Sequence, residues 1–248
     1  MLTKSVIKYI QSLQQKKYRD VHHAFVAEGP KVVLDLIASS FSNVKEVYAI
    51  ESWLEEINPS LLNSIRDKLY LVKSHELEKI SQYTTPNKVV GIFSKFKSDN
   101  QISLKNSSSL LLDSIQDPGN LGTIIRTADW FGIKNIICTP DTADMYNSKV
   151  VQSTMASLAN VNIIYDDLLK WIHAPKTIPV ISAVLGGDPL SSFTDKGHFM
   201  LVIGNESGGI RSEIIQASDK KLTIPVFGNA ESLNAAVATG IFLHYLKS

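Results

Sequence analysis

Apolar and polar residues alternate along the chain in two series, one on each side of a polar stretch. In the first series, apolar runs of strand length lie at residues 24–28, 44–50, 69–72 and 88–96. Segments with helical spacing of apolar residues lie between or before them, at 6–17, 30–40, 60–69 and 74–81. Strands that alternate with helices predict a small α/β sandwich.

The second series has longer and more continuous apolar runs. Five of them have strand length, at residues 110–115, 134–140, 178–185, 199–206 and 221–227. Helical segments are predicted at 120–131, 147–159, 166–174, 209–218 and 232–247. Continuously apolar strands separated by helices favour a mostly parallel sheet that is covered on both faces. In such sheets, ligands bind beyond the carboxyl ends of the strands.

The polar stretch at residues 98–108 has no periodicity and predicts a linker. It divides the chain of 248 residues into a domain of residues 1–97 and a domain of residues 109–248. No apolar run is long enough for a membrane span, so no membrane association is expected. The single cysteine, Cys138, excludes an internal disulfide and favours a cytoplasmic protein. The histidines lack metal-ligand spacing, so no bound metal is expected.

Charge changes the picture at the N-terminus. The net charge is only +1, but residues 1–19 contain five basic side chains and no acidic one. Lys16, Lys17 and Arg19 end this segment. Two interpretations remain open: a solvated basic helix face, or a surface for the phosphates of a nucleic acid.

Three predicted strand ends are rich in glycine, asparagine and serine, at residues 117–122, 203–209 and 224–236. Such turns let a ligand approach backbone N–H groups closely. None has the glycine spacing of a Rossmann dinucleotide site or a P-loop, which disfavours a nucleotide-binding oxidoreductase. The first turn precedes a helix in which Arg126 stands among apolar residues.

The order and content of these turns resemble the SpoU, or TrmH-like, branch of the SPOUT RNA ribose methyltransferases. Three motifs of that family, N-x-G-x-x-x-R, G-x-E-x-x-G and I-P-(x)n-S-L-N, occur in order over residues 108–248. The matching residues are Asn120, Gly122 and Arg126 in the first, Gly204, Glu206 and Gly209 in the second, and Ile224, Pro225, Ser232, Leu233 and Asn234 in the third. Glu28-Gly29, with the basic helix before it, resembles the N-terminal RNA-binding domain of the family, which is similar to ribosomal protein L30e. The chain departs from the family at Gln152 and Ala156, where many relatives have arginine and glycine, and this predicts altered RNA contacts or an altered turn.

This resemblance implies an α/β fold with an L30e-like sandwich and a C-terminal SPOUT domain that contains a deep trefoil knot. It implies S-adenosylmethionine as cofactor, a homodimer, and methylation of a ribose 2′-hydroxyl in structured RNA, with 23S ribosomal RNA favoured over transfer RNA. Small residues on the last helix (Ala235, Ala236, Ala238 and Gly240) are expected to allow close approach of a second helix in the dimer.

Residue roles follow from the same resemblance. The catalytic residues are expected to be Arg126, Asn120, Glu206, Ser232 and Asn234. The cofactor is expected to contact Leu185, Gly204, Asn205, Gly209, Ile224, Val226 and Leu233. RNA phosphates are expected to contact Lys16, Lys17 and Arg19.

Several alternatives stay open. Arg126 can stabilise the alkoxide rather than accept a proton, because a guanidinium stays protonated, and Glu206 can be the base or merely cap the following helix. Asn120 can orient Arg126 or cap its helix. The protein can also be a transfer RNA methyltransferase, a base methyltransferase, or an RNA-binding or ribosome-assembly factor without catalysis.

Overall fold

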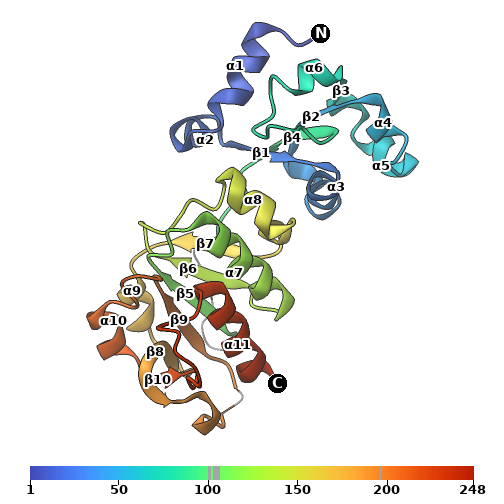
Figure 1. Ribbon diagram of the computed structural model, residues 1–248. Helices are drawn as coiled ribbons and strands as arrows, with labels where there is room; N and C mark the ends of the chain where they lie inside the picture. Colours follow the sequence, from blue (N-terminus) through green and yellow to red (C-terminus); the bar gives the residue numbers. More distant parts are fainter. Residues whose placement is uncertain (100–101, 103–106, 196) are drawn as a thin grey trace. The chain divides into compact units, whose positions relative to one another are not determined.

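The structure is a computed structural model that describes residues 1–99, 102, 107–195 and 197–248. Most of the predicted linker at 98–108 therefore lies outside the described residues. The chain forms two compact units (Figure 1): unit 1 contains Met1–Lys97 and Tyr146–Ala159, and unit 2 contains Ser98–Met145 and Asn160–Ser248. Within the described part of the chain, no helix combines the length and the apolar character that a membrane span requires.

Unit 1 is built on a four-stranded sheet with the strand order β1-β4-β2-β3. Its strands are β1 (Ala24–Glu28), β2 (Val44–Ala49), β3 (Leu69–Leu71) and β4 (Val89–Ser94). Its first helices are α1 (Lys4–Ser12), α2 (Lys16–His22), α3 (Pro30–Ser39), α4 (Glu51–Leu54), α5 (Pro59–Ser64) and α6 (Ser74–Leu77). Only β2 and β3 pair in parallel; β4 is antiparallel to β1 and β2.

Alternating residues of this sheet face two different apolar layers. Val26 and Ile92 belong to a buried cluster with Ile10 of α1, whereas α3 packs against β1 and β4. Helix α3 begins with Pro30 in its first turn, where the missing N–H of proline has no cost. Helices on a sheet confirm the α/β character predicted for this half of the chain.

Unit 2 contains a six-stranded parallel sheet with the strand order β10-β8-β9-β5-β6-β7. The strands are β5 (Ser109–Asp113), β6 (Asn135–Cys138), β7 (Asn162–Tyr165), β8 (Val180–Pro189), β9 (Met200–Gly204) and β10 (Lys220–Thr223). The helices are α7 (Pro118–Trp130), α9 (Leu168–Ile172), α10 (Ser212–Ala217) and α11 (Ala235–Lys247). The predicted parallel sheet is confirmed, whereas β7 was missed by the sequence pattern.

Both faces of this sheet are covered. Leu111, Ile137 and Val202 face one side and share a buried cluster with residues of α9 and α10. Helices α7 and α11 pack against each other, and α11 contacts β9. Cys138 is fully buried at the end of β6, as predicted, and burial raises the pKa of its thiol.

The segment Tyr146–Ala159 packs in unit 1, although its sequence lies between β6 and β7 of unit 2. The ring of Tyr146 lies 4.8 Å from that of Phe25, and its hydroxyl accepts a hydrogen bond from the Phe96 N–H at 2.8 Å. Helix α8 (Ser148–Thr154) contacts β1. The helix predicted at 147–159 therefore ends early, because Met155 has a φ of +49° and Ala156 a φ of +72°.

The backbone at Ala156 explains why glycine suits this position. A left-handed φ costs an L-residue with a Cβ about 1–2 kcal/mol relative to the right-handed region. Relief of this strain should make Ala156→Gly raise the free energy of unfolding, but only by about 0.5–1 kcal/mol, because the greater entropy of glycine in the unfolded chain offsets part of the gain. Calorimetry would show a rise of roughly 1–4 °C in melting temperature.

The matched control is Ala238→Gly within α11, where the backbone is helical and glycine lowers stability by about 0.5–1 kcal/mol. Equal destabilisation by both variants would contradict the interpretation that Ala156 is strained.

Candidate functional site

The candidate site lies at the point in the sheet of unit 2 where the strand order changes from one side of β5 to the other. From β5 the chain adds β6 and β7 on one side, whereas β9 lies beside β5 on the other side. A ligand site in a parallel sheet forms beyond the carboxyl ends of the strands at such a switch point. Asp113 and Gly204 pair with each other at these two carboxyl ends.

The turn after β5 opens helix α7 with a defined cap. The Asp117 carboxylate accepts a hydrogen bond from the Asn120 N–H at 2.8 Å, and Pro118 occupies the first turn. Asp117 is therefore the N-cap, and the suggestion that Asn120 caps this helix is wrong. This cap leaves the Asn120 side chain available for other contacts.

Asn120 joins the three motif loops. Its Nδ2 donates a hydrogen bond to Oε1 of Glu206, in the loop after β9. Its Oδ1 accepts one from Nδ2 of Asn234 at 2.8 Å, before α11. One chain of hydrogen bonds thus links Glu206, Asn120 and Asn234, although Asn120 and Asn234 are 114 positions apart. The Glu206 carboxylate is held by Asn120 and does not cap α10.

Asn234 has a second role in the fold. Its Oδ1 accepts hydrogen bonds from the N–H groups of Ala236 at 3.0 Å and Val237 at 3.3 Å, which makes it the N-cap of α11. The cap fixes the side chain, so the amide group that faces Asn120 is oriented before any ligand binds.

The turn at 204–209 is shaped by its own backbone. A Cβ on Gly204 would lie 2.3 Å from the carbonyl carbon of Gly209, and Gly209 itself has a φ of +66°. Asn205 donates from Nδ2 to the Ser114 carbonyl at 2.7 Å, and its Oδ1 accepts the N–H of Ser207 at 2.8 Å. The close approach of the chain to itself therefore requires glycine at position 204, and the Asn205 side chain is used within the fold.

Arg126 lies one to two turns beyond Asn120 on α7 and is exposed. The apolar neighbours in its sequence, including Ile124, Ile125 and Ala128, point into the core instead. Arg126 is thus on the solvent side of the helix, and no hydrogen bond or ion pair fixes its side chain among the described residues. Ser232 is also exposed, and the structure gives no contact that brings it to Asn120.

Four of the predicted cofactor residues lie on loops or strands at this edge and are not fully buried. Leu185, Val226 and Leu233 are exposed by 67%, 61% and 46%, which is unusual for apolar side chains, and Ile224 is half-buried. In β8, residues 183–187 lie opposite no residue of β10, because the register shifts between Ser182 and Asp188. These exposed apolar side chains fit a ligand with an apolar planar part, such as adenine.

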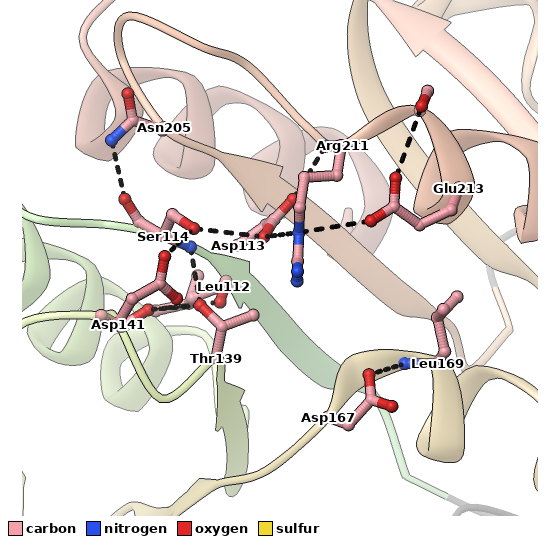
Figure 2. Close-up of polar contacts among 12 residues, drawn as sticks. Leu112, Asp113, Ser114, Thr139, Asp141, Asp167, Leu169, Asn205, Arg211 and Glu213 are labelled. Atoms are coloured by element: carbon pink, nitrogen blue, oxygen red, sulfur yellow. Dashed lines mark hydrogen bonds and ion pairs between the residues drawn. The ribbon is translucent and has the colours of Figure 1, made fainter.

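A second polar network at this edge was not found from the sequence (Figure 2). The fully buried Asp113 accepts hydrogen bonds from the Arg211 N–H at 2.8 Å and from its Nε at 2.9 Å. Ser114, with a φ of +60°, donates from its hydroxyl to Asp141 at 2.5 Å. The hydrogen bonds from Ser114 and from Thr139 hold the pKa of Asp141 below its usual range.

This network ties the loop after β9 to the end of β5 at two points, Asp113 to Arg211 and Ser114 to Asn205. The sequence contains no pattern that predicts the contact between Asp113 and Arg211, which are 98 positions apart. It indicates only that two polar residues, Asp113 and Ser114, stand at the end of an apolar strand.

The three basic residues predicted to bind RNA differ in their exposure to solvent. Lys16 and Lys17 are exposed at the start of α2. Arg19 is 4% exposed, and its Nη1 donates to the carbonyls of Leu13 at 2.9 Å and Gln14 at 2.7 Å, at the end of α1. Arg19 therefore satisfies backbone carbonyls within unit 1, and its buried side chain is not part of an exposed RNA surface.

Comparison with known proteins decides the family. The SpoU rRNA Methylase family model matches residues 107–244, more than half of the chain. This chain belongs to that family. The MRM3-like substrate binding domain model matches residues 4–91, which confirms a substrate-binding domain before the methylase domain.

Relatives cover almost the full length of this member of the SpoU rRNA methylase family. The 23S rRNA (guanosine(2553)-2′-O)-methyltransferase RlmP of Bacillus subtilis is 29% identical over 97% of this chain and 95% of its own. The AdoMet-bound rRNA methyltransferase from Sinorhizobium meliloti is 31% identical and has a TM-score of 0.85, over 100% of this chain and 95% of that one. A TrmH-family protein from Porphyromonas gingivalis is 32% identical, with a TM-score of 0.83 over 100% and 98% of the two chains. The resemblance to the SpoU/TrmH branch is thus confirmed; the knot and the likeness to L30e stay predictions.

Proposed function

We propose that this chain transfers a methyl group from S-adenosylmethionine to a ribose 2′-hydroxyl of 23S ribosomal RNA. The observation that carries the proposal is the chain of hydrogen bonds from Glu206 through Asn120 to Asn234, which joins the three family motifs at the switch point. The relatives named for rRNA 2′-O-methylation support ribose over base as the acceptor and ribosomal over transfer RNA.

When bound, the cofactor supplies a methyl group that its sulfonium has already activated. Leu185, Val226 and Leu233, with Ile224, would cover its adenosine part, and the turn at 204–209, which is exposed at residues 206–209, would face its polar groups. The fit rests on apolar side chains that the described chain leaves partly or largely exposed.

The acceptor is the ribose 2′-oxygen, which gains the methyl group and loses its proton, so the protein must stabilise this oxygen and accept the proton. Arg126 would stabilise the developing negative charge and grip the adjacent phosphate. A guanidinium is not a base at neutral pH, so Glu206 is the better proton acceptor. Its Oε1 is held by Asn120, which leaves Oε2 for the proton. Ser232 would add a neutral hydrogen bond near the cofactor.

The test of this function is to map ribose methylation in total RNA from cells with and without the gene. We expect a single 2′-O-methylated nucleotide of 23S ribosomal RNA to be lost. An unchanged ribosomal RNA and a lost transfer RNA methylation would favour the alternative substrate. If the RNA is unchanged and the purified chain does not bind S-adenosylmethionine, the protein is an assembly factor.

A ribosomal RNA substrate places the enzyme where ribosomes are made, which we propose is the cytoplasm. We also propose that no metal takes part, because an activated methyl group needs only orientation and charge stabilisation of the acceptor.

We propose a homodimer formed through α7 and α11. Of the small residues expected at its interface, Ala235 and Ala236 are buried within the chain, and a Cβ on Gly240 would contact Thr127 of α7. The helices still expose large apolar side chains: Trp130 is exposed by 85% and Val237 by 51%. Such apolar exposure on packed helices is typical of an interface.

We expect light scattering to give the mass of a dimer at micromolar concentration. Val237→Asp should give a monomer with little methyl transfer, because a charge cannot be buried in the interface without a partner. Lys247→Asp, at the exposed end of the same helix, is the control and should remain a dimer. A fully active wild-type monomer would refute the homodimer.

We propose that Lys16 and Lys17 bind RNA phosphates. Replacing both with glutamine should weaken RNA binding and reduce the slope of log K against log salt by about 0.7–0.9 for each lost phosphate contact. The matched control is the exposed pair Lys220 and Lys221 on β10, changed in the same way. If both double variants show the wild-type salt dependence of RNA binding, Lys16 and Lys17 form only a solvated face of α2 and do not bind RNA phosphates.

A further inference from the structure

The loop between β10 and α11 exposes an aromatic ring to which the proposed function gives no task. Residues 225–234 are exposed without interruption. Among the described residues, Phe227 is the most exposed aromatic side chain, at 98%. Val226 and Leu233 of the same loop have a role beside the cofactor in the proposed site, whereas Phe227 has none.

The Phe227 ring is almost fully exposed, so the described residues leave both of its faces uncovered. The residues after it are Gly228, Asn229 and Ala230, which carry small side chains or none. No ring–ring or cation–π contact includes Phe227 in the part of the chain that the structure describes. A ring in this setting can be covered on a whole face by another flat group.

The charges of the loop exclude a phosphate as that group. Residues 224–234 contain no lysine or arginine, and Glu231 is their only charged residue. A backbone phosphate would be repelled by this carboxylate and attracted by nothing nearby in the loop. The uncharged π-face of a base has no such cost, and stacking on aromatic side chains is how proteins hold unpaired RNA bases.

The loop also connects Phe227 to the reacting centre. Asn234 ends the loop and donates a hydrogen bond to Asn120 at 2.8 Å. Seven residues of extended chain reach at most about 25 Å, so Phe227 stands within a few nucleotides of the ribose that these side chains would orient.

We propose that Phe227 stacks on an unpaired base beside the nucleotide that is methylated. This inference rests on the proposed function and adds a selection rule to it. A base inside a duplex is already stacked on both faces, so only a nucleotide in a loop or bulge can place its base on the ring. The contact depends on accessibility rather than base identity, because every base has a π-face.

The experiment compares Phe227→Ala, Phe227→Leu and Phe227→Trp in the full chain, with 23S ribosomal RNA transcribed in vitro as the probe. Filter binding gives the Kd for RNA, calorimetry the Kd for S-adenosylmethionine, and light scattering the mass. Phe227→Ala and Phe227→Leu should each weaken RNA binding roughly 5- to 100-fold, as expected for the loss of one stacked base. Phe227→Trp should bind RNA as well as the wild type, and cofactor affinity and mass should not change.

The leucine variant separates stacking from simple apolar contact. If Phe227→Leu binds RNA like the wild type, or if Phe227→Ala does, the stacking proposal is wrong. A change in mass would show that the ring contacts a second copy of the chain instead, which also overturns it. A wild-type protein that methylates no RNA would refute the proposed function itself, whereas an active wild type with indifferent Phe227 variants refutes only this inference.

Discussion

Arg126→Ala is expected to lower the turnover number about 100- to 1,000-fold, the usual cost of losing one preorganised donor at a developing charge. The side chain is exposed one to two turns beyond Asn120, and no described residue engages it. Cofactor affinity and melting temperature should therefore be unchanged. Single-turnover methylation of RNA measures the rate, and calorimetry measures the cofactor affinity and the melting temperature.

Arg126→Lys tests the geometry of the same contact. A lysine carries the charge as a point and cannot offer two parallel N–H donors to a phosphate or an alkoxide, so it should restore little activity. Lys134→Ala is the matched control, because this exposed cation directly precedes β6, at the amino end of that strand and away from the carboxyl ends that form the site. Near-normal rates for both Arg126 variants would leave it a surface arginine with no part in catalysis.

The exposed position of Arg126 agrees with the helix that the sequence predicted, although Ile125 and Ala128 lie close to it in the sequence. At 3.6 residues per turn, Leu121, Ile125 and Ala128 form one buried stripe, and position 126 lies about 100° away from it. A charged residue whose sequence neighbours are apolar can therefore still lie on the solvent-exposed side of a helix.

Alternation of apolar runs predicted most elements and the parallel sheet, because strand and helix periodicity are local properties. The motifs predicted which loops meet, and Asn120, Glu206 and Asn234 do meet. Strand β7 was missed because it has only four residues, from Asn162 to Tyr165, and two aspartates follow it directly, which is typical of a loop.

Roles that depend on how the chain folds back on itself could not be predicted. Gly204 is a glycine because Gly209 returns to within contact of it, and Arg19 is buried because it satisfies the end of α1. These partners lie only five or six positions away, but hydrophobic periodicity does not indicate the turns that bring them together. The packing of Tyr146–Ala159 in unit 1 depends on a truly distant contact, since the other part of that unit ends at Lys97.

The pair of Asp113 and Arg211 is the strongest case of such a distant contact. Asp113 is fully buried, and both of its carboxylate oxygens are engaged by Arg211, one by the backbone N–H and the other by Nε. A buried carboxylate that loses its cation keeps the cost of leaving water without the gain from the pair. The pair also anchors the loop that carries Glu206.

We expect Arg211→Ala to lower the free energy of unfolding by about 2–3 kcal/mol, less than for a wholly buried pair because the Arg211 side chain is 48% exposed. Arg126→Ala is the control, since it removes an exposed arginine from the same unit. Adding Asp113→Asn to Arg211→Ala should restore part of the loss, because no buried charge is then left unpaired. Chemical denaturation of the four variants in this cycle measures the coupling. If the double variant is as unstable as the sum of the single ones, the two side chains act independently, and the loop after β9 is held by its backbone alone.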